Sequence, residues 1–195
     1  MSKLSIPVGA KDHRQGDPGA ACTLVEYGDY QCPSCRQAYP IVKRLQKHFG
    51  KQMSFVFRNF PLTQMHPYAE PAAETAEFAG AHNKFWEMHD LLYENQDRLR
   101  EDGLLDELAQ GLHLAPAQLH EALETKEFQP RVKSDFTGGV RSGVNGTPTF
   151  FINGLRHDGS YDFDSLVDAV HMAAHVRDTI GLRADWPRNR ARACC

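Results

Sequence analysis

The sequence predicts an α/β fold with a helical insertion, and three observations lead to this prediction. A strand, a helix and a second strand follow one another near the N-terminus. Residues 63–142 then carry helical patterns only. Strand patterns return at residues 149–157 and are followed by a last helix. The element order is therefore β-α-β, a helical block, and β-β-α.

The first unit begins with a strand at about residues 22–28, where Thr23 to Tyr27 form a β-branched run. A helix at about 33–49 follows, and its apolar positions repeat at helical spacing: Tyr39, Val42, Leu45 and Phe49. Pro40 lies inside this helix and is expected to kink it. A second strand at about 53–60 is apolar on both faces, as in a buried strand. This order implies a right-handed crossover and a parallel pair of strands.

The middle of the chain favours helices only, because Ala, Glu, Leu and Lys recur there between helix-breaking residues. The predicted helices lie near residues 67–81, 84–95, 103–112, 116–125 and 127–142. A strand at 149–152, the turn Asn153-Gly154 and a strand at 155–157 then form a hairpin. A final helix runs from about 162 to 178, with apolar residues on one face.

This element order divides the chain into parts. We expect one discontinuous α/β domain, made of residues 20–62 and 143–178, with the helical insertion at 63–142 between its halves. An N-terminal arm at 1–19 and a C-terminal tail at 179–195 flank this domain. The chain has 195 residues, 41% of them hydrophobic and 24% charged, which is enough for a sizeable core.

The composition argues against two classes of partner. A formal net charge of −3 argues against a surface that binds nucleic acid or an anionic membrane. No stretch is long and apolar enough to span a membrane, and residues 1–20 lack the apolar core of a secretory signal. We therefore expect a cytoplasmic protein, with a signal that has been removed as the alternative. In the cytoplasm, paired cysteines are more often catalytic or metal-binding than structural.

The main chemical motif is Cys32-Pro33-Ser34-Cys35, which joins the first predicted strand to the first predicted helix. Residues three apart on a helix lie on one face, with Cβ atoms about 5–6 Å apart. A disulfide needs Cα atoms roughly 4.4–6.8 Å apart. Cys32 and Cys35 can therefore open and close a bond with little backbone movement. The alternative is half of a zinc site, which would need two more ligands.

The start of a helix predicts different roles for the two thiols. Unpaired N–H groups and the helix dipole stabilise a thiolate at Cys32, so its pKa is expected between about 3.5 and 7.5. We expect Cys32 to be the exposed nucleophile and Cys35, one turn further in, to be the resolving thiol. Pro33 fits the first helical position because its missing N–H needs no partner there.

Together these residues resemble the thioredoxin superfamily, and more closely its DsbA-like disulfide oxidoreductases. The resemblance covers about residues 20–178. It rests on the strand-CxxC-helix opening, Pro40 eight residues after Cys32, Gly146-Thr147-Pro148 before the β-β-α end, and the helical insertion. It implies a thioredoxin-like fold and a dithiol that needs no further cofactor, with glutathione as a candidate co-substrate. The implied partners are thiol or disulfide protein substrates and an unidentified electron donor or acceptor.

The resemblance assigns roles to three further residues. In thioredoxin-like folds an acidic residue six positions before the first cysteine lies beneath the dithiol and relays protons, and Glu26 has that position here. Pro148 corresponds to the family's cis-proline, which faces the active-site disulfide. The backbone of the preceding residue, Thr147, is then expected to pair with an extended substrate strand. The plain alternative for Glu26 is a surface glutamate, although Glu26 shares a strand face with Leu24.

Ser34 distinguishes this motif from that of strongly oxidising relatives, in which a histidine at its position helps to stabilise the thiolate. Serine can donate a hydrogen bond but carries no charge, so we expect a less oxidising couple. Two other functions stay open. One is a glutathione-dependent transferase or isomerase of the kappa type, which does not need paired cysteines. The other is a chaperone-like binding module whose dithiol holds a metal or senses oxidants.

The remaining cysteines and two histidines carry weaker signals. Cys22 is expected to be a small buried hydrophobe. Cys194 and Cys195 end the chain, and a four-thiolate zinc site with the CxxC motif would require the tail to reach that motif. His171 and His175 are four apart on the last predicted helix, but no acidic or thiol partner is evident nearby. We therefore expect ordinary surface or boundary histidines and no metal site.

Overall fold

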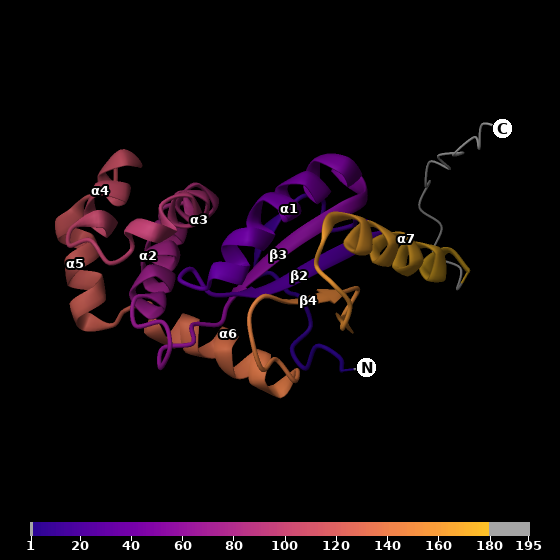
Figure 1. The fold of residues 1–195 in the computed structure, drawn as a ribbon. Coiled ribbons are helices and arrows are strands. Elements are labelled where there is room, and N and C mark those ends of the chain that lie inside the picture. Colours follow the sequence, from indigo (N-terminus) through magenta and orange to yellow (C-terminus); the bar gives the residue numbers. More distant parts are fainter. Residues whose placement is uncertain (1, 180–195) are drawn as a thin grey trace.

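The structure is a computed structural model that describes residues 2–179, and its centre is a five-stranded mixed sheet (Figure 1). The strands are β1 (His13–Gln15), β2 (Cys22–Gly28), β3 (Met53–Asn59), β4 (Thr149–Ile152) and β5 (Leu155–His157), in the spatial order β1-β3-β2-β4-β5. β2 pairs parallel with β3 and antiparallel with β4, while both edge strands pair antiparallel with their neighbours. The predicted α/β class and the parallel β2–β3 pair are confirmed.

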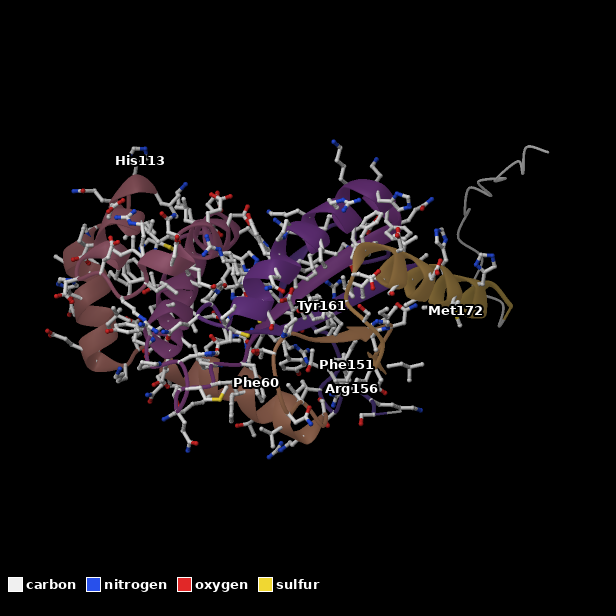
Figure 2. The ribbon with its side chains drawn as sticks, viewed as in Figure 1. Phe60, His113, Phe151, Arg156, Tyr161 and Met172 are labelled. Atoms are coloured by element: carbon white, nitrogen blue, oxygen red, sulfur yellow. The ribbon has the colours of Figure 1, made fainter. Side chains whose placement is uncertain are left out.

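Seven helices surround this sheet within the described residues. They are α1 (Pro33–Phe49), α2 (Ala69–Ala81), α3 (Phe85–Glu94), α4 (Leu104–Gly111), α5 (Pro116–Thr125), α6 (Gln129–Arg141) and α7 (Phe163–Thr179), with short 3-10 helices at Gly50–Gln52 and Gln96–Arg98. In Figure 1, α2 to α5 form a group at one end of the molecule and α7 lies at the other. Figure 2 marks these ends with His113, between α4 and α5, and Met172 on α7. Each predicted helix is therefore present.

The helix that carries the dithiol has clear local signals at both ends. Cys32 is the N-cap residue, with an extended backbone, and Pro33 occupies the first helical position, as predicted. The helix continues through Pro40 and ends at Phe49. Gly50 then adopts a φ of 51°, which glycine tolerates better than other residues. The start and the end of this helix are thus marked by the local sequence.

The sheet is buried on both faces, and each face has its own hydrophobic core. One face includes Leu24 and Phe57 and is covered by α1, α7 and the insertion helices α2 and α3. The other face includes Tyr27 and Val56 and is covered by α6 and the N-terminal arm. Every residue of β3 is buried, which confirms the prediction of a strand that is apolar on both faces.

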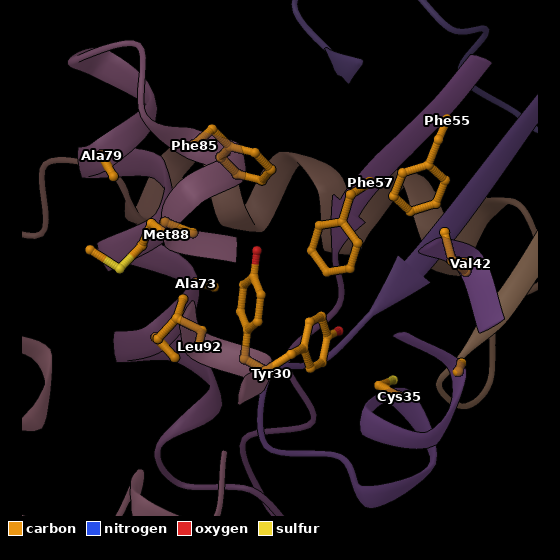
Figure 3. Close-up of a cluster of buried hydrophobic side chains, with 14 of the residues drawn as sticks. Tyr30, Cys35, Val42, Phe55, Phe57, Ala73, Ala79, Phe85, Met88 and Leu92 are labelled. Carbon is orange, nitrogen blue, oxygen red and sulfur yellow. The ribbon is translucent and has the colours of Figure 1, made fainter. Parts of the chain in front are cut away.

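The helical insertion shares the core on the α1 side of the sheet. Tyr30, just before the CxxC motif, lies between Phe57 of the sheet and Met88 and Leu92 of α3 in the close-up (Figure 3). Its hydroxyl hydrogen-bonds to Nδ1 of His89 on the same helix at 3.0 Å. All five side chains are buried. The insertion therefore supports the segment that leads into Cys32.

The N-terminal arm, for which the sequence predicts no strand, contributes β1 and a buried ion pair. β1 pairs with β3 at the edge of the sheet. Arg58 of β3 is 3% exposed and donates to Asp12 through Nε at 2.8 Å and through a terminal nitrogen at 3.1 Å. The guanidinium also donates to the carbonyl oxygens of Ile6 and Pro7. The arm is thus built into the fold.

Some sequence expectations fall outside what the structure describes. Cys194 and Cys195 lie beyond residue 179, together with most of the tail. The division into a discontinuous domain and an insertion stays a prediction. Between residues 2 and 179, no helix is long and apolar enough to cross a membrane.

Candidate active site

The two cysteines of the CxxC motif lie where β2 ends and α1 begins, and both are thiols. The Cys32 N–H donates to the carbonyl oxygen of Asp29 at 3.1 Å, which closes a turn before α1. The side-chain amide of Gln96 donates to the carbonyl oxygens of Tyr30 at 2.8 Å and Cys32 at 2.9 Å. Gln96 lies 64 residues after Cys32, so no local pattern could show this contact.

Cys32 is less accessible than its motif suggests. Its exposed fraction is 6%, and the prediction of an exposed nucleophile is wrong because Thr147 covers the sulfur. The Cys32 Sγ donates to the Thr147 carbonyl oxygen at 3.3 Å. Cys35 is fully buried one turn further into α1.

The surroundings of Cys32 favour its thiolate. Its pKa is lowered from an ordinary value of 9.0 to about 5, chiefly by the hydrogen bond with the Cys35 thiol, while burial opposes the shift. The Thr147 side chain and the backbone N–H groups of Cys35 and Ser34 lower the pKa further. The Thr147 carbonyl can accept only from a protonated sulfur, so that contact favours the thiol. Ser34 contributes through its backbone, not through a charge.

Cys35 and Glu26 are shifted in the opposite direction. Burial raises the pKa of Cys35 well above its ordinary value, and the hydrogen bond to Cys32 raises it further. Glu26 lies on β2 between Phe57 of β3 and Phe150 of β4 and is 2% exposed. Burial, with a smaller contribution from the Cys32 charge, raises the pKa of Glu26 to about 8. Its Oε1 has no hydrogen-bond partner among the described residues.

The loop before β4 brings Thr147 and Pro148 to the dithiol. The Thr147–Pro148 peptide bond is cis. At the start of β4, the Thr149 hydroxyl donates to the Gly146 carbonyl oxygen at 2.7 Å and so closes the loop. Both Thr147 and Pro148 are half-buried. Because β4 pairs with β2, this loop lies next to the strand that carries Glu26 and leads to Cys32.

The other candidate residues do not form a second site with the dithiol. Cys22 is fully buried in the core, as predicted. On α7, the His171 ring packs against Phe49 at 5.3 Å between centroids, and Nδ1 of His175 lies 2.9 Å from the His171 carbonyl oxygen. In the part of the chain that the structure describes, no three His, Cys, Asp or Glu side chains gather in a way that could hold a metal ion.

Two kinds of sequence comparison bear on this site. A family model described as Thioredoxin matches residues 9–171. The Na(+)/H(+) antiporter NhaA 1 of Salinispora arenicola is 46% identical over 171 residues, which are 87% of this chain and 26% of that protein. The Na(+)/H(+) antiporter NhaA of Nitrosospira multiformis is 39% identical over 169 residues, which are 86% of this chain and 27% of that protein. The chain thus spans about a quarter of the length of these curated relatives.

Solved structures show the same fold. Oxidised BdbD from Bacillus subtilis has a TM-score of 0.80 at 27% identity, over 89% of this chain and 98% of that one. A thioredoxin-like oxidoreductase from Silicibacter pomeroyi has a TM-score of 0.71 at 25% identity, over 86% and 94%. The alpha-DsbA1 of Wolbachia pipientis has a TM-score of 0.77 at 18% identity, over 91% and 97%, which bears on the fold alone. The predicted thioredoxin-like, DsbA-like fold is confirmed.

Proposed function

The chain belongs to the thioredoxin family, and from this premise we propose that it is a thiol–disulfide oxidoreductase that works through Cys32 and Cys35. One observation carries the proposal. The two hydrogen-bonded thiols have opposite pKa shifts, to about 5 at Cys32 and well above the ordinary value at Cys35, and a buried Glu26 interacts with both. A thiolate next to a protonated thiol is suited to stepwise disulfide exchange.

In the first step, the Cys32 thiolate attacks one sulfur of a substrate disulfide. A bond forms between Cys32 and that sulfur, and the substrate disulfide breaks. The other substrate sulfur leaves with the electron pair as a thiolate and takes a proton from water. Since the pKa of Cys32 is about 5, its sulfur is largely ionised at neutral pH and needs no separate base.

In the second step, Cys35 resolves the mixed disulfide. Its thiol gives its proton to the Glu26 carboxylate, and the Cys35 sulfur attacks Cys32. The second substrate sulfur leaves as a thiolate, and the chain holds a Cys32–Cys35 disulfide. Two electrons have then passed to the substrate. The reverse sequence oxidises a substrate dithiol, and the reduction potential and the electron partner set the direction.

The mixed disulfide itself favours the proton transfer. The negative charge of Cys32 raises the pKa of both Glu26 and Cys35. This charge disappears when Cys32 is bonded to the substrate, so both pKa values fall. Glu26 is then more often ionised, and Cys35 loses its proton more readily. After the first step, Glu26 can therefore accept a proton more readily and Cys35 can release its proton more readily.

Thr147 and Pro148 supply the substrate platform in this proposal. The Thr147 carbonyl oxygen is 3.3 Å from the Cys32 Sγ, so a peptide strand paired with the Thr147 backbone would bring its own cysteine to the nucleophile. Backbone pairing does not depend on particular side chains, so protein substrates of different sequence can bind in this way. Glutathione is a candidate co-substrate, and a second redox protein or small thiol would restore the starting state.

The names of the curated relatives denote an activity of much longer proteins. Only about a quarter of each antiporter matches this chain, and the Thioredoxin model matches residues 9–171 here. We therefore assign dithiol exchange, not ion transport, to the matched region in this proposal.

The test is insulin-disulfide reduction, together with refolding of a reduced substrate. We expect Cys32→Ser to lose both activities, and Cys35→Ser to accumulate a mixed disulfide that mass spectrometry detects. Cys22→Ala, which removes a cysteine outside the dithiol, is the matched control and should stay active. Full activity of Cys32→Ser would refute the assignment. Conjugation of glutathione to an electrophile that persists in Cys35→Ser would favour the kappa-type transferase instead.

A further inference from the structure

Asp29 lies just before the CxxC motif, and its carboxylate is completely buried. Oδ1 accepts the Gln31 N–H at 2.7 Å, while Oδ2 accepts the Leu62 N–H at 2.8 Å and contacts Nδ1 of His66 at 2.8 Å. The two backbone donors come from opposite sides, one from the turn before α1 and one from the loop before α2. His66 supplies the third contact and is the one side chain among the three.

The backbone of Asp29 holds the dithiol directly. Its carbonyl oxygen accepts the Cys32 N–H at 3.1 Å, and its own backbone N–H hydrogen-bonds to Cys35. With the Gln31 contact, the carboxylate closes a turn of the kind that Asp often forms with the residue two positions on. Any rotation of the Asp29 side chain therefore moves the turn that positions both sulfurs.

His66 is itself fixed by the loop before α2. The backbone N–H of His66 donates to the Leu62 carbonyl oxygen at 2.8 Å, and the backbone carbonyl oxygen of His66 accepts the Ala69 N–H at 3.1 Å where α2 begins. The His66 side chain is 15% exposed, so one edge of the ring reaches solvent while Nδ1 faces the buried carboxylate. The imidazole thus contacts Asp29 from a loop that is held by backbone hydrogen bonds.

We propose that His66 is a positioning residue for the dithiol: by holding the Asp29 carboxylate it keeps the turn at residues 29–32, and with it Cys32, in place against Cys35 and Thr147. This inference rests on the proposed function, because it concerns the same nucleophile. Hydrogen bonds to the Cys32 sulfur weaken steeply with distance and angle, so a small movement of the turn reduces the support of the thiolate. Gln96 still holds the carbonyl oxygens of Tyr30 and Cys32 without His66, and the turn should shift rather than unfold.

The experiment titrates Cys32 in the reduced protein, and the rate of its alkylation by iodoacetamide is measured as a function of pH. Replacement of His66 by leucine removes the ring nitrogen that contacts the Asp29 carboxylate. We expect the pH midpoint of Cys32 alkylation to rise by about one unit, which is about a tenfold loss of thiolate at pH 4. His66→Asn places an amide N–H near the position of Nδ1 and should keep the midpoint close to that of the wild type. This rescue separates positioning from a general loss of structure.

The matched control is a second histidine–carboxylate pair. His120 on α5 contacts Asp106 on α4 through Nε2 at 2.9 Å, and α2 and α3 lie between this pair and α1 (Figure 1). His120→Leu should leave the midpoint unchanged. An unchanged midpoint in folded His66→Leu, or an equal rise in His66→Asn, would overturn the proposal.

A replacement variant and a readout without substrate ensure that the titration can refute the proposal. If His66→Leu does not fold, His66→Gln, whose amide stands one bond further from the backbone, takes its place, and an unchanged midpoint there overturns the proposal equally. The alkylation needs no substrate disulfide. Failure of this inference would therefore show in the titration, whereas failure of the proposed function would show as insulin reduction by Cys32→Ser.

Discussion

Replacement of Glu26 by glutamine tests whether a buried carboxyl lies beneath the dithiol as an ionisable group. Glutamine has nearly the same shape as a protonated glutamate but cannot ionise. In the reduced wild-type protein, burial and the Cys32 charge raise the pKa of Glu26 from an ordinary value of 4.5 to about 8. The folded protein therefore retains this proton at pH values where the unfolded chain has lost it.

The sign of the effect on stability follows from this difference. Below pH 4.5 the carboxyl is protonated in both states and the charge causes no loss of stability. Between pH 4.5 and 8 the free energy of unfolding of the wild type falls relative to the Glu26→Gln variant. At about 1.4 kcal/mol per pH unit, the relative loss is about 3 kcal/mol at pH 7 and about 5 kcal/mol above pH 8.

The assay is urea denaturation with a thiol reductant present, at several pH values from 4 to 8.5, for the wild type and Glu26→Gln. We expect the variant to gain stability over the wild type as the pH rises. Glu124→Gln on α5 removes an exposed carboxylate and serves as the control, with no such trend. The free energies of unfolding of the wild type and Glu26→Gln are compared at pH 4.5 and pH 8. If their difference is the same at both pH values, the pKa of Glu26 is not raised and its role as proton acceptor loses its basis.

Three further results are expected. Alkylation of reduced Cys32 should be half-maximal near pH 5, because the pKa of this thiol is lowered to about 5. Arg58→Leu should lower the free energy of unfolding by about 3–5 kcal/mol in chemical denaturation, since Asp12 is left as a buried charge without its partner. The double variant Arg58→Leu/Asp12→Leu should recover part of this loss. Gly28→Ala should cost about 1–3 kcal/mol in the same assay, because its Cβ would overlap the Phe57 ring and lie 3.0 Å from the Tyr93 hydroxyl.

Each of these results has an outcome that contradicts it. A Cys32 midpoint near that of free glutathione would show that the site does not stabilise a thiolate. A double variant at Arg58 and Asp12 that is no more stable than Arg58→Leu would mean that the lone carboxylate is not the source of the loss. Unchanged stability of Gly28→Ala would mean that the sheet and α3 can separate at this position.

The elements that could be predicted are those with local signals. The apolar spacing of α1 and the apolar runs of β2 and β3 needed only neighbouring residues. At Asn153-Gly154 both residues have positive φ, 48° and 82°, as the predicted hairpin turn requires. In contrast, β1 has three polar residues of intermediate burial and exists because it pairs with β3, about forty residues further on. No local pattern reports such a pairing.

The candidate site shows the same division. The CxxC motif and the acidic residue six positions before it are close in sequence, so the motif and the family resemblance indicated both. The contacts that shape the site come from far along the chain: His66 lies 37 residues from Asp29, and Thr147 lies 115 residues from Cys32. The expectation of an exposed Cys32 was wrong for this reason.

The separation of Cys32 and Thr147 also orders events during synthesis. The dithiol leaves the ribosome more than a hundred residues before the loop that covers it. Until β4 pairs with β2, Glu26 lacks its neighbour Phe150, and Cys32 lacks the Thr147 side chain that helps to lower its pKa. The nascent chain therefore carries two cysteines of more ordinary reactivity. The full set of contacts that lowers the pKa of Cys32 is complete only when the last part of the sheet is in place.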